Sequence, residues 1–258
     1  MNFMALGPEV KIQDYEGGTI LYDSSRASNA SSGWLEASWW AERGTVSAAE
    51  GGRGSAYLIE ADARSLVLRH YRRGGMVARL FKDRYWWRGA ERTRSFHEWH
   101  LLYLMHRAGL PVPLPIAAGY RRHGSTYTAD LLVQRIPAVR TLAAALTAGP
   151  VSLGVWVAIG RCLRNFHAHG IYHADLNAHN ILLGADQNDV WLIDFDRGAV
   201  RVPGWWSDAN LVRLQRSLNK ISATLGGERF SGADWQALVH SYFSAAIETR
   251  PLQASVAL

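Results

Sequence analysis

Short apolar runs separated by glycine-rich or charged turns fill the chain between about residues 45 and 135. Runs of this length, bounded by turn residues, are typical of β-strands. They lie at residues 45–50, 56–61, 66–71 and 131–133. From residue 94 to 108 the apolar positions recur instead at helical spacing. This part of the chain is therefore predicted to be strand-rich with one helix.

After residue 137 the pattern is mainly helical. A helix is predicted to end near Gly170, because four apolar residues before it share one face. These are Val155, Ile159, Leu163 and Phe166. Residues 210–225 and 234–249 show two further helical patterns. By contrast, residues 181–183 and 190–193 are apolar runs of strand length around a polar turn, which predicts a hairpin.

Together the two regions predict an α+β fold. We expect one domain of two lobes, with a strand-rich N-terminal lobe at about residues 1–136 and a mainly helical C-terminal lobe at about residues 137–258. The prolines within residues 110–115 predict a stiff extended connector, and residues 135–137 are predicted to form a hinge. The first forty residues carry no motif that we can assign.

The amino-acid composition limits the classes of protein to which the chain can belong. A hydrophobic content of 48% predicts a folded globular chain. The single cysteine, Cys162, excludes an intramolecular disulfide and favours a reducing, cytoplasmic setting. We expect neither a secretory signal nor a membrane span, because no stretch reaches the roughly 18 apolar residues that a spanning helix needs.

The formal charge of +6 comes almost wholly from arginine, since the only lysines are Lys11, Lys82 and Lys220. Arginine favours bidentate recognition of phosphate or carboxylate groups. We expect no nucleic-acid partner, because the sequence has no basic recognition helix, zinc finger or aromatic RNA-binding signature. An anionic small molecule or an anionic lipid explains the charge as well.

Tryptophan is abundant, with eleven residues. Core packing explains most of them. Residues 84–88, however, mix three aromatic residues with two arginines, as a membrane-interface segment does. Contact with an anionic membrane surface is therefore a second hypothesis for this segment.

Catalytic chemistry is indicated by residues 173–180 and by Asp194-Phe195-Asp196. Phosphoryl transfer needs one carboxylate to orient the acceptor hydroxyl, and an Asn and a second carboxylate to hold Mg²⁺ against the phosphates. We assign the first role to Asp175 and the Mg²⁺ ligands to Asn180 and Asp194. A polar loop beside a hairpin would explain the composition of this segment but not its spacing. Asp196 either adds a carboxylate near the metal or caps a turn.

Candidate ATP-binding residues precede this segment in the order that a kinase requires. A glycine-rich loop between two predicted strands supplies backbone N–H groups for a triphosphate. Its residues are Gly51, Gly52, Arg53, Gly54 and Ser55. Arg69 stands on the next strand, where kinases usually carry a lysine, and Glu98 on the following helix is predicted to pair with it. Lys82 is the reserve candidate for a phosphate-binding lysine.

The sequence resembles the 3-deoxy-D-manno-octulosonic acid (Kdo) kinases of Gram-negative lipopolysaccharide synthesis. The matching stretches lie at residues 68–75, 93–98, 109–113, 172–182 and 191–196. Ala174 and the lack of an Ala-Pro-Glu motif after Asp194 distinguish the chain from phosphorylation-switched protein kinases. The resemblance implies a two-lobed protein-kinase-like fold, and Arg69 belongs to the family pattern.

The resemblance also implies an acceptor and a location. The family transfers phosphate from ATP to a Kdo hydroxyl, at the 4-position, on a lipid A precursor at the cytoplasmic face of the inner membrane. Such an acceptor is anionic and suits a group of arginines in the N-terminal lobe. They are Arg72, Arg73, Arg79, Arg84, Arg88, Arg92 and Arg94. The alternatives are a kinase of another small-molecule or core-sugar hydroxyl and a nucleotide-binding pseudokinase.

Overall fold

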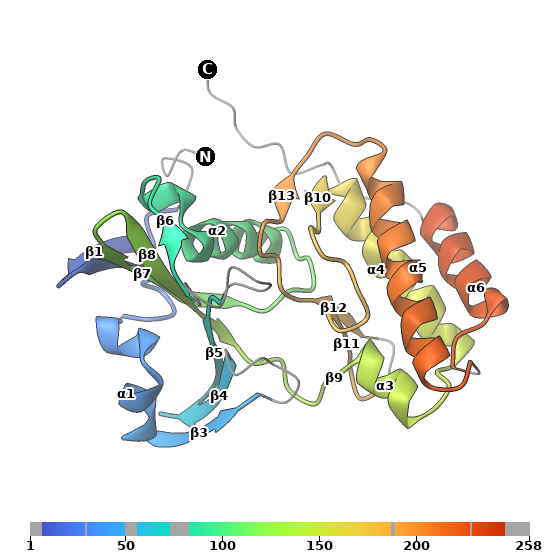
Figure 1. The fold of residues 1–258 in the computed structure, drawn as a ribbon, viewed down its shortest axis with the longest axis horizontal. Helices are drawn as coiled ribbons and strands as arrows, with labels where there is room; N and C mark the ends of the chain where they lie inside the picture. The colour runs from blue at the N-terminus through green and yellow to red at the C-terminus, as the bar shows by residue number, and fades with distance from the viewer. Residues whose placement is uncertain are drawn as a thin grey trace. The chain divides into compact units, whose positions relative to one another are not determined.

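The computed structural model describes residues 7–28, 30–49, 56–72, 83–186, 189–227 and 229–245. Contacts between residues divide the chain into two compact units. Unit 1 contains residues 1–103 and 114–135, and unit 2 contains residues 104–113 and 136–258. Unit 1 is built on a large sheet, and unit 2 is mainly helical (Figure 1).

Unit 1 holds an eight-stranded antiparallel sheet with the strand order β1-β2-β7-β8-β5-β4-β3 and with β6 paired to β8. The strands are β1 (Val10–Tyr15), β2 (Gly18–Asp23), β3 (Gly44–Ala48), β4 (Ala56–Ala61), β5 (Arg64–His70), β6 (Tyr85–Trp86), β7 (Pro115–His123) and β8 (Thr126–Gln134). The sheet thus starts at Val10, whereas the first strand predicted within this lobe lay near residue 45, so β1 and β2 were missed. In β1 polar residues interrupt the apolar ones, and in β2 the apolar run is only three residues long, from Ile20 to Tyr22.

One face of this sheet is covered by η2 (Ser32–Leu35) and α1 (Ala37–Ala41). Two tryptophans from this cover, Trp34 and Trp40, pack on buried strand residues that include Ile59 and Leu132. Gly119 on β7 lies so close beneath the cover that a Cβ there would stand 2.1 Å from Cδ1 of Leu35. The contact explains why β7 has a glycine in its middle.

The opposite face of the sheet packs against α2 (Arg94–Arg107). The rings of Phe96 and Tyr120 lie 5.3 Å apart between centroids. The Ser95 hydroxyl donates to the carbonyl oxygen of Gly119 at 2.8 Å, and the backbone N–H of Arg94 donates to the Tyr127 hydroxyl at 3.1 Å. These bonds fix the start of α2 on the sheet.

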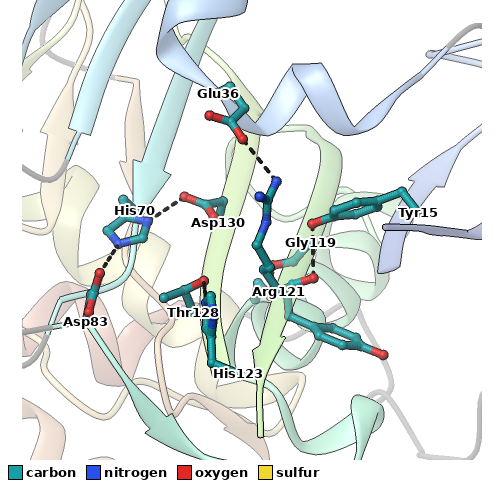
Figure 2. Close-up of polar contacts among 11 residues, drawn as sticks. Tyr15, Glu36, His70, Asp83, Gly119, Arg121, His123, Thr128 and Asp130 are labelled. Atoms are coloured by element: carbon teal, nitrogen blue, oxygen red, sulfur yellow. Dashed lines mark hydrogen bonds and ion pairs between the residues drawn. The ribbon is translucent and has the colours of Figure 1, made fainter. Parts of the chain in front are cut away.

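A row of polar side chains crosses the sheet (Figure 2). His70 lies opposite Asp130 in the strand register, and their side chains are 2.7 Å apart. The hydrogen bond to Asp130 raises the pKa of His70. Arg121 reaches Glu36 at 3.1 Å in the same view. Because side chains alternate between the faces of a strand, His70 and its neighbour Arg69 lie on opposite faces.

The described part of unit 2 after residue 135 contains four helices and two small sheets. The helices are α3 (Leu142–Ala148), α4 (Leu153–Ala168), α5 (Trp206–Thr224) and α6 (Gly232–Ser244). The strands are β9 (Arg140–Thr141), β10 (Ile171–Tyr172), β11 (Ile181–Leu183), β12 (Val190–Leu192) and β13 (Ala199–Val200). The predicted hairpin is present as β11 and β12. Helices α4 and α6 lie alongside each other (Figure 1) and meet closely at Gly160.

Two buried histidines predict that acid destabilises the protein. Burial lowers the pKa of His100 and of His167 from the ordinary 6.5 to about 4. Their folded forms therefore stay neutral below pH 6.5, whereas the unfolded chain takes up protons there. Each histidine should lower the free energy of unfolding by about 2 kcal/mol between pH 7.5 and pH 5.

Urea unfolding of the protein and of His167→Gln at the two pH values checks this prediction. The glutamine amide can still meet the Tyr242 hydroxyl, which lies 2.8 Å from Nδ1 of His167. The variant should lose less stability between pH 7.5 and pH 5 than the unmodified protein. An equal loss would mean that His167 does not contribute. His70 acts in the opposite direction, because its raised pKa adds stability as the pH falls, and it is unchanged in both proteins.

Candidate active site

Helix α4 leads directly into the predicted catalytic loop. Gly170 follows the helix with a φ of 74°, and its carbonyl oxygen accepts a hydrogen bond of 2.7 Å from the backbone N–H of Arg201. A Cβ at Gly170 would stand 2.5 Å from the Arg201 carbonyl oxygen. Only glycine meets both conditions without strain. The chain is thereby fixed where β10 pairs with β13, just before His173.

His173 organises the loop from within. Its side chain is buried, and burial lowers the pKa of this histidine. Nδ1 accepts a hydrogen bond of 3.1 Å from the backbone N–H of Asp175, so the proton of the neutral ring lies on Nε2. Nε2 donates to the carbonyl oxygen of Ile193 at 2.9 Å. His173 therefore connects the backbone of Asp175 to the residue before Asp194.

The β11–β12 hairpin places Asn180 and Asp194 at its open end. Ile181 pairs with Leu192, and the backbone N–H of Ile193 donates to the carbonyl oxygen of Asn180 at 3.1 Å. The side-chain N–H of Asn180 donates to the carbonyl oxygen of Asp175 at 2.9 Å. This leaves the amide oxygen, the atom that would bind Mg²⁺, outside the hydrogen bonds that the structure shows for Asn180.

Asp194 has a φ of 64°, in the left-handed region that Asp and Asn tolerate better than most residues. Strained backbone of this kind is concentrated at functional sites. Phe195 behind it is fully buried, with its ring 5.8 Å from the ring of Phe166 and 4.7 Å from that of His173. Packing of Phe195 thus fixes the chain directly after the predicted metal ligand.

In the described part of the chain, no three His, Cys, Asp or Glu side chains gather as a metal site. Mg²⁺ needs fewer protein ligands, because one or two carboxylates and the substrate phosphates complete its coordination. The amide oxygen of Asn180 and the partly exposed carboxylate of Asp194 fit this pattern. They would hold the ion only together with nucleotide phosphates.

Helix α5 holds the loop from outside, and sequence reasoning missed its part in the site. The side chain of Asn210 is buried and forms hydrogen bonds with both backbone polar groups of His173. It accepts from the N–H at 3.2 Å and donates to the carbonyl oxygen at 2.9 Å. Ser217 accepts from the backbone N–H of Ala178 at 3.2 Å. The signal in the sequence was a polar residue, Asn210, within the apolar stripe of α5. The buried apolar residues of α5 are Trp206, Leu211, Leu214 and Leu218.

Asp175 projects outward from the loop that these contacts hold. Its side chain is 58% exposed, so its carboxylate can meet a substrate. One oxygen, Oδ2, accepts from the side-chain amide of Asn177 at 3.2 Å. The other, Oδ1, lies 3.6 Å from Nη1 of Arg213 on α5. Rigid backbone and an exposed carboxylate are what a proton acceptor for a substrate hydroxyl requires.

Unit 1 contains the predicted ion pair. Nη2 of Arg69 contacts Oε2 of Glu98, whose side chain is buried. The same oxygen accepts a hydrogen bond of 2.6 Å from the hydroxyl of Tyr71, and the Arg69 guanidinium lies 4.5 Å from the centroid of the Tyr71 ring. Arg69 and Tyr71 are two residues apart on one strand face, so both reach the same carboxylate. Tyr71 was not among the predicted site residues.

The Tyr71 hydroxyl should help to orient Arg69 through Glu98. Tyr71→Phe keeps the ring but removes a hydrogen-bond donor to Glu98, so Arg69 should lose part of its fixed direction. Since a hydrogen bond to a charged group contributes about 1.5–3 kcal/mol, we expect the KM for ATP to rise about tenfold or more. Steady-state kinetics with varied ATP measures this. Tyr57→Phe, on β4 of the same sheet, is the control, and equal KM values for both variants would contradict the role.

Gly51, Gly52, Arg53, Gly54, Ser55 and Lys82 lie outside the described residues. Their predicted contacts with nucleotide phosphates stay predictions. Of the arginines expected to meet an anionic acceptor, Arg73 and Arg79 also lie outside, whereas Arg84, Arg88 and Arg92 are exposed. Arg94 instead stands over an aromatic ring, 4.7 Å from the centroid of Tyr85.

Comparisons with known proteins show which family the chain resembles. A model of the lipopolysaccharide kinase (Kdo/WaaP) family matches residues 37–242. The 3-deoxy-D-manno-octulosonic acid kinase of Xylella fastidiosa (strain M23) is 46% identical over 235 residues, which cover 89% of this chain and 91% of that protein. The protein of the same name from Stenotrophomonas maltophilia (strain K279a) is 47% identical over 206 residues, or 79% and 81% of the two chains.

One solved structure shows the same fold. It is described as WaaP in complex with acyl carrier protein, and it superposes with a TM-score of 0.52 at 18% sequence identity. The match covers 79% of this chain and 80% of that chain. At this identity the likeness concerns the fold alone. The predicted α+β, protein-kinase-like fold is confirmed.

Proposed function

The chain belongs to the lipopolysaccharide kinase (Kdo/WaaP) family, and we propose that it phosphorylates a Kdo hydroxyl, at the 4-position, on a Kdo-bearing lipid A precursor. Family membership makes the chain an ATP-dependent phosphotransferase. The observation that carries the proposal is the identity of 46% over 89% of the chain with a 3-deoxy-D-manno-octulosonic acid kinase. The exposed carboxylate of Asp175, on a loop held by α5, supports the chemistry.

In the proposed reaction the acceptor hydroxyl oxygen attacks the γ-phosphorus of ATP. The bond from this phosphorus to the β–γ bridging oxygen breaks, and ADP leaves. Asp175 orients the hydroxyl and receives its proton, since its side chain is exposed and its backbone is fixed by His173. Asn180 and Asp194 would hold Mg²⁺, which neutralises charge on the phosphate oxygens.

The nucleotide contacts of unit 1 belong to the same proposal. Arg69 binds phosphate oxygens of ATP, and Glu98 and Tyr71 fix its direction. Arginine suits this task because its planar group can donate to two oxygens at once. Residues 51–55 would add backbone N–H groups to the triphosphate.

We place the reaction at the cytoplasmic face of the inner membrane, with the protein bound peripherally to anionic lipid. In the part of the chain that the structure describes, no helix is both long and apolar enough to span a bilayer. Trp86 is 65% exposed, and its neighbours Arg84 and Arg88 are exposed as well. Trp87 faces inward and packs on Tyr120, with 4.9 Å between ring centroids. An exposed tryptophan between arginines suits an anionic interface.

Trp86→Ala should weaken binding to anionic vesicles several-fold, because the indole ring no longer enters the interface. Sedimentation with vesicles of mixed anionic and neutral phospholipids measures the bound fraction. Trp205→Ala is the matched control, since Trp205 is 80% exposed and lies in unit 2. A loss of binding in the Trp205 variant alone would place the membrane contact in unit 2 and contradict the proposal.

Mass spectrometry tests the proposed reaction. The purified protein is incubated with ATP, Mg²⁺ and a lipid A precursor that carries one or two Kdo residues. A mass gain of one phosphate supports the proposal, and phosphorus-coupled NMR of the product identifies the hydroxyl. No gain with either acceptor, together with measurable ATP binding, would overturn it in favour of another hydroxyl acceptor or a non-catalytic nucleotide-binding role.

A further inference from the structure

An arginine stands beside the candidate proton acceptor without a hydrogen bond to it. Nη1 of Arg213 lies 3.6 Å from Oδ1 of Asp175, and the two side chains are 51% and 58% exposed. This distance exceeds a normal hydrogen bond. Arg213 makes no side-chain hydrogen bond to any other residue that the structure describes. The N–H groups of its guanidinium therefore remain available to a ligand.

The position of Arg213 is fixed by the helix that carries it. Asn210 and Ser217 precede and follow it by three and four residues on α5, and both bond to the catalytic loop. Residues at this spacing share one face of a helix. Arg213 is therefore presented to Asp175 by two contacts that also hold the loop, rather than by a flexible segment.

Stability does not explain the pair. Exposed ion pairs contribute about 0–1 kcal/mol, and a separation without a hydrogen bond places this pair at the low end. The next exposed arginine on α5, Arg216, has no ion pair among the described residues and offers a comparison at the same surface. A cation beside a reacting carboxylate has a clearer use in substrate binding.

An acidic acceptor creates an electrostatic problem at this site. Its carboxylate must approach Asp175 and Asp194 as well as the phosphates of ATP, and like charges at such distances repel. The catalytic loop itself, residues 173–180, contains no lysine or arginine. Arg213 is the cation that the described contacts place at Asp175.

We propose that Arg213 binds the carboxylate of the acceptor sugar acid and thereby brings the acceptor hydroxyl to Asp175. This inference rests on the proposed function, because it takes the acceptor to be a Kdo residue. The planar guanidinium donates two parallel hydrogen bonds to a carboxylate, which fixes orientation as well as distance. The carboxylate of the acceptor is then the group by which the enzyme recognises and orients it.

A cycle of two enzymes and two acceptors tests the proposal. The enzymes are the unmodified protein and Arg213→Gln; the acceptors are the Kdo-bearing precursor and its analogue with the Kdo carboxylate converted to a carboxamide. For the acidic acceptor, Arg213→Gln should lower kcat/KM about tenfold to a hundredfold. For the carboxamide the two enzymes should differ by less than about threefold, because the partner of Arg213 is already absent.

Three controls accompany the cycle. Arg216→Gln removes the same charge one helical turn away and should leave kcat/KM for the acidic acceptor within about twofold, as expected for an exposed charge. Arg213→Lys keeps the positive charge but lacks the planar guanidinium that donates two parallel hydrogen bonds. It should therefore lose less kcat/KM than Arg213→Gln. The KM for ATP should be unchanged in Arg213→Gln, and its melting temperature should match that of Arg216→Gln.

The outcomes are distinguishable. Equal losses with both acceptors, or a higher KM for ATP in Arg213→Gln, would overturn the inference and assign the residue to phosphate or to the general electrostatics of the site. The proposed function would stand in that case. If the unmodified protein transfers phosphate to neither acceptor, the proposed function fails and the inference fails with it.

Discussion

Asp175→Asn should lower the rate of phosphate transfer by about 10²- to 10⁴-fold while ATP still binds. The substitution keeps the size of the side chain but removes its capacity to accept the hydroxyl proton. The contacts that fix the loop use other groups, namely the backbone N–H of Asp175, the ring of His173 and the amide of Asn210. The loss should therefore appear in kcat, with little change in the KM for ATP.

Single-turnover transfer to the acceptor and equilibrium binding of ATP, measured on the same preparation, separate the two effects. Asp208→Asn is the control, because Asp208 is an exposed carboxylate in the first turn of α5. It should transfer phosphate at nearly the normal rate. A rate within about threefold of normal for Asp175→Asn would remove Asp175 from its role as proton acceptor.

Gly160→Ala should have the largest effect on stability. A Cβ at Gly160 would lie 2.2 Å from the carbonyl oxygen of Leu238 and 3.0 Å from the backbone nitrogen of Tyr242. Both atoms belong to the backbone of α6, so no side-chain movement relieves the contact, and α4 and α6 must separate. Overpacking of this kind costs about 2–3 kcal/mol, or roughly 4–12 °C in melting temperature.

Gly154→Ala, on the same helix, makes this experiment specific. Gly154 is exposed, and the nearest atom to its added Cβ is Oγ of Ser152 at 3.7 Å. Because alanine is the better helix former, this variant should be neutral or slightly more stable. Thermal unfolding followed by circular dichroism compares the two variants. Equal melting temperatures would mean that α6 does not approach α4 as closely as the structure shows.

The regular, strongly apolar elements could be predicted from the sequence. Strand β4 matches the prediction at both ends, and the β11–β12 hairpin is where the two apolar runs placed it. Helix α4 ends just before Gly170, as predicted. In each case one local pattern determines the element, and packing agrees with it. The predicted helix at residues 234–249 was less accurate, because α6 ends at Ser244.

Strand β7 shows where local pattern fails. Its first residue, Pro115, was predicted to end the connector, and the small residues that follow up to Gly119 were not predicted as a strand. The small residues are needed because η2 packs on this strand, with Leu35 directly over Gly119. A requirement set by a segment more than eighty residues away is not visible in the local sequence.

The candidate site likewise contains some residues whose roles the sequence predicted and others whose roles it did not. The ion pair of Arg69 and Glu98 could be predicted, because the order of motifs suggested it. The roles of Asn210, Ser217 and Arg213 could not, since their partners lie between 37 and 39 residues away along the chain. Helical spacing shows that a polar residue lies on a buried stripe, but it does not show what that residue contacts.

The way in which α5 holds the catalytic loop has a consequence for control in the cell. Asn210 and Ser217 use uncharged side chains of the folded protein itself, and Ala174 stands where switched kinases carry an arginine. Loop geometry then needs no added phosphate group, and we expect the protein to be active without one. An inhibitor must compete with a substrate rather than trap an inactive loop.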